Sequence, residues 1–252
     1  MKKTITLALS LILLAIASQP ALAQESYLEQ QRENARVKQA LADKEQILAD
    51  NLSKNGLTAN DVHILITAYK AEKKLEIYAK KKTETEYRQI AVYDICNSSG
   101  VLGPKRQEGD LQVPEGFYTI DRFNPWSNYY LSLGINYPNQ ADRKKSNAPR
   151  LGGDIFIHGD SVTIGCLPMS DDKIKEIYLY AVYAKDNGQS NIPVYIFPFR
   201  MTDENLQNYK KQYAAHQELL NFWTNLKTGY DKFFSEKKAL NVSVDREGNY
   251  LF

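Results

Sequence analysis

The stretch "FIHGDSVTIGC", Phe156 to Cys166, carries two candidate nucleophiles, and they require different folds. If Ser161 is the nucleophile, the Gly-Asp-Ser sequence around it belongs on a strand-to-helix turn of an α/β sheet. If Cys166 is the nucleophile, His158 is available as its base, and the fold does not have to contain an α/β sheet. The segments on either side of this stretch therefore decide both the fold and the chemistry.

The segments upstream predict a β-rich core. "DVHILITAYKAEKKLEIYAK", residues 61–80, alternates apolar and polar positions on both sides of a polar turn, which predicts a hairpin. "EYRQIAVYDIC", Glu86 to Cys96, predicts a third strand. The Gly- and Pro-rich stretch from Gly100 to Ile120 predicts a long loop that returns into a strand, and such loops often carry function.

The segments downstream and at the two ends add strands and helices. "YYLSLGINY", "GDIFIHG" and "NIPVYIFPF" predict further strands, and a helix is expected from Ser170 onward. A single helix with a capping box at its start is expected between Ser26 and Gly56. From Thr202 the tail is expected to be helical and to end in a small hairpin. The predicted class is α+β, an antiparallel β-sandwich with flanking N- and C-terminal helices.

The first 23 residues have the features of a secretory leader. Lys2 and Lys3 precede an apolar run, and Ala21-Leu22-Ala23 offers small residues at a cleavage site. The run is shorter than the about 20 residues that a membrane span needs, so we expect a periplasmic protein that is cleaved after Ala23 and has no membrane span. The formal charge of +2 excludes nucleic-acid binding by bulk charge. The predicted organisation is a leader at 1–23, a helical segment at 24–58, a catalytic domain at 59–201 and a helical extension at 202–252.

The serine nucleophile does not find its partners in the rest of the chain. A Gly-Asp-Ser esterase needs an Asp-x-x-His pair near its C-terminus. The only histidine after Ser161 is His216, and Tyr213-Ala214-Ala215 precedes it. Too few strand–helix units follow Ser161 to complete a doubly wound sheet. We therefore reject the serine hypothesis.

The cysteine hypothesis finds its partners close by. His158 is expected at a strand end, where its ring can accept the proton of the Cys166 thiol. Gly165 allows a tight turn, so the backbone amides of Gly165 and Cys166 are candidates for an oxyanion hole. The helix expected from Ser170 directs its positive end towards the same region. Together these features favour the thiolate and predict a lowered pKa for Cys166.

Three segments together resemble a known family. "IHGDSVTIGC", with "GPKRQEGDLQVPEGFY" upstream and "YIFPFRMT" downstream, resembles the L,D-transpeptidase catalytic-domain family of YkuD type over about residues 61 to 202. His158-Gly159 matches the family's His-Gly, and Thr163 to Cys166 matches its Ser/Thr-x-Gly-Cys nucleophile. The resemblance implies a β-sandwich enzyme that acts on peptidoglycan stem peptides. Its cysteine attacks the carbonyl at the L-centre of meso-diaminopimelate and releases D-alanine or another attached group.

The chain departs from the family pattern beside the nucleophile. Ile164 and Pro168 stand where many members have a histidine and an arginine, and the spacing of eight from His158 to Cys166 is short. A shortened motif of this kind resembles a branch that removes attached protein from peptidoglycan. A peptidoglycan-linked lipoprotein is therefore an expected partner beside the stem peptides, and resolution of the thioester by an amine or by water both remain open.

Other residues complete the expected site. Lys105, Arg143 and Tyr130 are further candidates for substrate binding. Three histidines without ligand spacing, and no Cys-x-x-Cys, predict no metal or cofactor. The alternative is a non-catalytic cell-wall-binding β-sandwich with a Cys96–Cys166 disulfide, a bond common in exported proteins. The terminal helical segments are expected to carry no catalytic group.

Overall fold

The computed structural model describes residues 25–252, and the predicted leader lies outside them. The helices are α1 (Tyr27–Arg32), α2 (Ala35–Lys54), α3 (Gln140–Lys144), α4 (Ser170–Asp186), α5 (Asp203–Gln212) and α6 (Gln217–Glu236). The main-sheet strands are β1 (Val62–Tyr69), β2 (Lys74–Lys81), β3 (Arg88–Asp94), β4 (Gly116–Asn124), β5 (Ser132–Ile135), β6 (Phe156–His158), β7 (Leu167–Pro168) and β8 (Pro193–Phe197). A small hairpin, β9 (Ser243–Val244) with β10 (Tyr250–Leu251), follows near the C-terminus, as predicted.

The α+β class with flanking helices is confirmed. The eight strands follow one another in the order β3-β2-β1-β8-β4-β5-β6-β7. Within residues 25–252 the pairs β1·β8 and β6·β7 of this sheet are parallel, and the other five are antiparallel. Strand β4 pairs with β8 through its first half and with β5 through its second half, with a register shift between Ile120 and Arg122. Such an irregularity bends a strand, so the sheet curls at β4.

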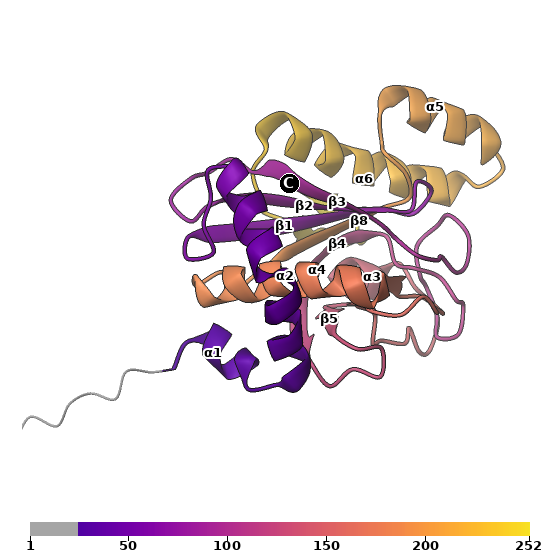
Figure 1. Ribbon diagram of the computed structural model, residues 1–252. Helices are drawn as coiled ribbons and strands as arrows, with labels where there is room; N and C mark the ends of the chain where they lie inside the picture. Colours follow the sequence, from indigo (N-terminus) through magenta and orange to yellow (C-terminus); the bar gives the residue numbers. More distant parts are fainter. Residues whose placement is uncertain (1–24) are drawn as a thin grey trace, which may run out of the picture.

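Helices cover both faces of the sheet (Figure 1). Strand β1 illustrates the division, because its alternate side chains enter two different hydrophobic clusters. Ile64 and Ile66 pack in the cluster that contains α2 and α4, whereas Leu65 and Tyr69 pack in the cluster that contains α6. The predicted hairpin of β1 and β2 is confirmed, with Ile66 opposite Ile77. Both terminal helical segments thus supply core residues to the sheet.

The N-terminal segment forms two helices, so the prediction of one helix between Ser26 and Gly56 was wrong. Ser26 caps α1, since its hydroxyl accepts a bond of 3.2 Å from the Glu29 N–H. Asn34 then caps α2, and its side chain accepts a bond of 2.8 Å from the Arg36 N–H. An asparagine that caps a new helix competes with continuation of the preceding one. The chain therefore changes direction at Asn34.

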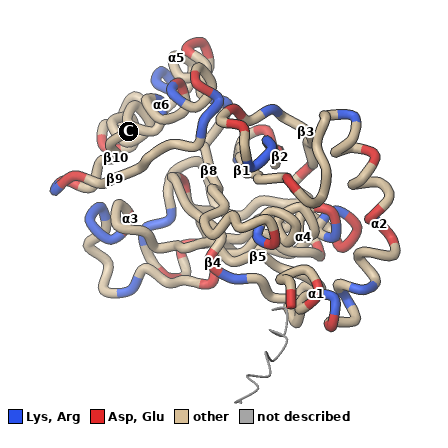
Figure 2. The backbone as a smooth tube through the Cα atoms, turned by 90° about the vertical axis from the view of Figure 1, so that its left-hand side faces the viewer, with Lys and Arg blue, Asp and Glu red and all other residues tan. Residues whose placement is uncertain are grey.

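Charges of both signs are distributed along the described chain. Figure 2 shows acidic and basic positions interspersed on the backbone, in keeping with the small net charge of +2. Among the helices of residues 25–252, none combines the length and apolar character that crossing a membrane requires.

Candidate active site

His158 and Cys166 lie on neighbouring strands. His158 ends β6, which pairs in parallel with β7 so that His158 lies opposite Pro168. Cys166 immediately precedes β7, and its Sγ accepts a hydrogen bond of 3.4 Å from the Phe156 N–H. Alternate residues of a strand point to the same face of a sheet. Phe156 and His158, two residues apart on β6, therefore share one face of the sheet, and Cys166 Sγ lies against the Phe156 amide from the start of the neighbouring strand.

The turn after His158 needs a glycine. A Cβ on Gly159 would lie 2.7 Å from the Tyr129 carbonyl oxygen and 2.5 Å from Asp171 Oδ1. Asp171, in the first turn of α4, accepts a hydrogen bond of 2.8 Å from the Asp160 N–H. The start of α4 therefore binds the turn that follows His158 and fixes where β6 ends.

Thr163 shapes the turn that presents Cys166. The Thr163 hydroxyl accepts bonds from the amides of Gly165 at 3.2 Å and Cys166 at 2.9 Å, and donates to the Cys166 carbonyl at 2.8 Å. Gly165 has φ +135°, and a Cβ there would lie 3.0 Å from the Gln112 carbonyl oxygen. Both amides expected to hold the oxyanion thus point at the Thr163 hydroxyl, which an oxyanion would have to replace.

The hydrogen bonding of His158 fixes its tautomer. Nδ1 lies within bonding distance of the Gly159 carbonyl oxygen, which can only accept, so Nδ1 carries the proton. The lone pair is then on Nε2, the nitrogen that can accept the thiol proton. The ring of Tyr129 lies 4.7 Å from the His158 ring with an angle of 31° between them. His158 is almost fully buried, and Tyr129 covers one side of it.

Burial keeps both reacting groups neutral at rest. Desolvation raises the pKa of the Cys166 thiol and the charge of Asp154 raises it further, while the Phe156 N–H and the charge of Lys105 oppose them. Desolvation lowers the pKa of His158, against the Gly159 hydrogen bond and the charge of Asp160. The expected low thiol pKa was therefore wrong in direction. The arrangement fits a neutral imidazole that removes the thiol proton during attack.

This arrangement predicts how the thiol reacts with pH. In a Cys96→Ser background, alkylation of Cys166 by iodoacetamide should be slow at neutral pH and accelerate in alkali, because the thiol pKa is raised. Catalytic turnover should decline only below about pH 6.5, because a lowered His158 pKa keeps the base neutral to lower pH. Rapid alkylation that is constant from about pH 5 to pH 7 would indicate a preformed thiolate and contradict this prediction.

Tyr130 contacts α2 and α4, whereas its neighbour Tyr129 covers His158. The Tyr130 ring lies between the cations of Arg36 and Lys175, 5.8 and 5.5 Å from its centre. Arg36 Nη1 of α2 donates to the carbonyls of Ser127 and Tyr130, both at 2.5 Å. The N-terminal helix therefore holds the turn from which Tyr129 covers His158.

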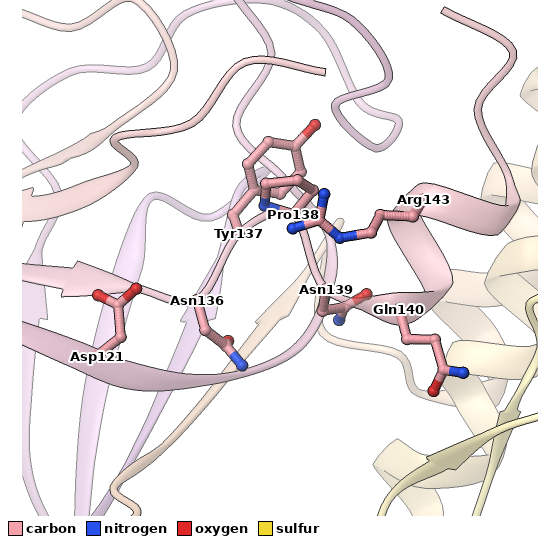
Figure 3. A pocket seen from close by; sticks show the side chains of 7 residues that line it. All are labelled: Asp121, Asn136, Tyr137, Pro138, Asn139, Gln140 and Arg143. Atoms are coloured by element: carbon pink, nitrogen blue, oxygen red, sulfur yellow. The ribbon is translucent and has the colours of Figure 1, made fainter. Parts of the chain in front are cut away.

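Lys105 and Arg143 lie in different surroundings. Lys105 is buried and its Nζ binds Asp110 Oδ1 at 2.6 Å, although its charge still reaches the Cys166 thiol. Arg143, on α3, lines a shallow hollow of about 580 Å³ (Figure 3). The other lining residues, none of them Cys166 or His158, are Asp121, Asn136, Tyr137, Pro138, Asn139 and Gln140. Of these two candidates, the structure brings only Lys105 close to the thiol.

The two departures from the family pattern differ in exposure. Ile164 is 76% exposed in the loop before the thiol. Pro168 is buried in β7, and its carbonyl accepts a bond of 2.8 Å from the Cys96 N–H. Ile164 can therefore contact an incoming acceptor, whereas Pro168 is part of the sheet. Both cysteines are free thiols, so the disulfide of the non-catalytic alternative is not formed.

A family model and a similar known protein identify one family. The model of the L,D-transpeptidase catalytic domain, YkuD, matches residues 63–196. The chain is 39% identical over 193 residues to YafK of Escherichia coli K12, which is provisionally named an L,D-transpeptidase, and the match covers 76% of this chain and 74% of YafK. Similar solved structures include Pgp2, the helical cell shape determining protein of Campylobacter jejuni, with a TM-score of 0.44, 19% identity and 74% of each chain covered. Bd1075 of Bdellovibrio bacteriovorus matches with a TM-score of 0.39 and 22% identity, over 70% of this chain and 64% of Bd1075.

Proposed function

The chain belongs to the L,D-transpeptidase catalytic-domain family of YkuD type, and we propose that it is a periplasmic cysteine enzyme acting on peptidoglycan stem peptides at meso-diaminopimelate. Cys166 is the nucleophile and His158 the base. The observation that chiefly supports this assignment is their place on neighbouring segments, His158 at the end of β6 and Cys166 just before β7, with the Nδ1 proton of His158 bound to Gly159. The predicted leader, outside the described residues, accounts for export.

The acylation step uses these groups in sequence. His158 Nε2 takes the thiol proton while Sγ forms a bond to the carbonyl at the L-centre of meso-diaminopimelate. The proton passes from His158 to the leaving amine as the C–N bond breaks, and a thioester remains on Cys166. The amides of Gly165 and Cys166 bind the oxyanion once the Thr163 hydroxyl turns away. D-alanine leaves as an amine in this step, and a lipoprotein linked to peptidoglycan through an amine would leave in the same way.

The thioester is hydrolysed by water at least as often as it is transferred to an acceptor amine. An acceptor amine must be held within about 3–3.5 Å of the thioester carbonyl, which requires polar positioning groups. Ile164 offers an exposed apolar side chain where many relatives offer a histidine. Water needs only His158 as its base. The proposed outcome is therefore mainly hydrolysis, as L,D-carboxypeptidase or as amidase releasing attached protein.

Mass spectrometry of the products tests this proposal. We expect a tetrapeptide donor with excess diaminopimelate-bearing acceptor to yield at least as much tripeptide as 3-3 cross-linked dimer. Sacculi that carry linked lipoprotein, incubated in parallel, should release it. Ile164→His, at a site that is 76% exposed, should shift products towards cross-linking without loss of folding. Predominance of dimer with the unmodified enzyme would reject hydrolysis as the main outcome.

A further inference from the structure

Ser132 is the direct cross-strand neighbour of His158. Strand β5 pairs antiparallel with β6, and Ser132 lies opposite His158. The backbone bonds of this ladder join Gly159 to Leu131 at 3.1 Å and Ile135 to Ile155 at 3.0 Å. In the alternating pattern of an antiparallel pair, Ser132 and His158 then form a non-hydrogen-bonded pair, in which side chains approach most closely. The two side chains share one face of the sheet, the face to which Phe156 also belongs.

The Ser132 hydroxyl is buried without a partner in the described chain. Ser132 is 1% exposed, and its Oγ makes no hydrogen bond within residues 25–252. A buried hydroxyl without a partner is costly, and nearly all such groups bond to protein or to water. The neighbour on its other side, Asn124, already uses its Oδ1 to accept from the Trp126 N–H at 3.1 Å. Within residues 25–252 no group bonds the Ser132 hydroxyl, so a bound water molecule can serve as its partner.

The nitrogen of His158 that performs chemistry is also without a partner. Nδ1 is engaged by the Gly159 carbonyl, and no residue between 25 and 252 hydrogen-bonds Nε2. A small molecule bound to Ser132 Oγ would lie near the imidazole of His158, because the two residues are paired across the strands. Tyr129 covers the imidazole from one side. Two groups without a partner in residues 25–252, a hydroxyl and a basic nitrogen, thus belong to directly paired residues, one of them the proposed base for Cys166.

We propose that Ser132 binds and orients the water molecule that resolves the thioester on Cys166. The inference rests on the proposed function, since it concerns the second half of that reaction. The Ser132 hydroxyl holds the water while His158 Nε2 removes a proton from it, and the water oxygen forms a bond to the thioester carbonyl. The C–S bond then breaks, the peptide leaves as a carboxylic acid, and His158 returns the proton to the thiolate of Cys166. Ser132 therefore favours water over an amine as the group that resolves the thioester.

The test is Ser132→Ala with Ser132→Thr as the matched control. In the alanine variant the burst of D-alanine that reports acylation should keep its rate, while hydrolysis should slow on the order of 10-fold. The thioester should accumulate in the mass spectrum of the intact protein. Hydroxylamine, which resolves the thioester without the bound water, should restore turnover. The threonine variant keeps a hydroxyl on a strand that favours β-branched residues and should behave like the unmodified enzyme.

The possible outcomes separate the two levels of the proposal. Unchanged hydrolysis in Ser132→Ala would overturn the role of Ser132, and so would a burst that slows in parallel with hydrolysis. The melting temperature of Ser132→Ala should be unchanged or higher, because the deleted hydroxyl has no partner in the chain. If the unmodified enzyme formed neither thioester nor product, the proposed function itself would fail, whatever Ser132 does.

Discussion

Replacing Cys166 by serine should abolish turnover on stem peptides, with a loss on the order of 10⁴-fold or more. The serine hydroxyl is nearly the size of the thiol, but its pKa is far too high for a neutral imidazole to activate it. The Cys166 Sγ makes only long contacts, 3.4 Å to the Phe156 amide and 3.6 Å to the Asp154 carbonyl, so little stability depends on sulfur. Product release measured by mass spectrometry, together with an unchanged melting temperature, checks the expectation.

Ser161→Ala is the matched control for this variant. Ser161 lies in the same loop, is exposed, and contacts Asp160 through its hydroxyl at 3.4 Å. We expect its removal to leave the rate nearly unchanged. An inactive Ser161→Ala beside an active Cys166→Ser would restore the esterase hypothesis, in which the same eleven-residue stretch presents a different nucleophile.

Most strands and helices could be predicted because their signals are local, but β7 and α3 were not predicted. Alternation at Ile64 and Ile66 predicted β1, but it did not identify the segment that covers the second face of the strand, which is α6. That face depends on Leu65 and Tyr69 meeting a helix more than 140 residues later in the chain, which periodicity cannot reveal. The break at Asn34 was missed because the capping box at Ser26 and the apolar face that begins at Val37 were assigned to one helix.

The site was only partly predictable for a similar reason. Spacing and motif identified His158 and Cys166 as candidates, and the parallel pairing of β6 and β7 brings the segments that carry them side by side. The sequence could not show which of two adjacent tyrosines covers His158, because that choice depends on how Arg36 binds the turn. The raised thiol pKa likewise follows from burial by distant segments. The sequence predicted a strand that contains Ser132, but it did not show which residue of β6 lies opposite Ser132.

A buried ion pair behind the active-site loop should dominate the stability of this region. Glu115 Oε1 accepts from the Gly103 N–H at 2.7 Å and from Lys70 Nζ at 2.9 Å, and Oε2 accepts from Trp223 Nε1 at 2.9 Å. Both charged side chains are at most 3% exposed. These bonds connect the end of β1 and helix α6 to the loop whose Gln112 carbonyl packs on Gly165.

Glu115→Gln should therefore destabilise the protein by about 3–5 kcal/mol, because it leaves the Lys70 charge buried without a counterion. For a chain of this length that corresponds to a fall in melting temperature of about 6–20 °C.

Glu108→Gln is the matched control, since Glu108 is in the same loop but its side chain is 49% exposed and pairs with an exposed Arg150. Its removal should cost less than about 1 kcal/mol. Urea unfolding of both variants decides the matter: equal small losses would mean that the Lys70–Glu115 pair contributes nothing special, and that α6 holds the loop through apolar packing alone.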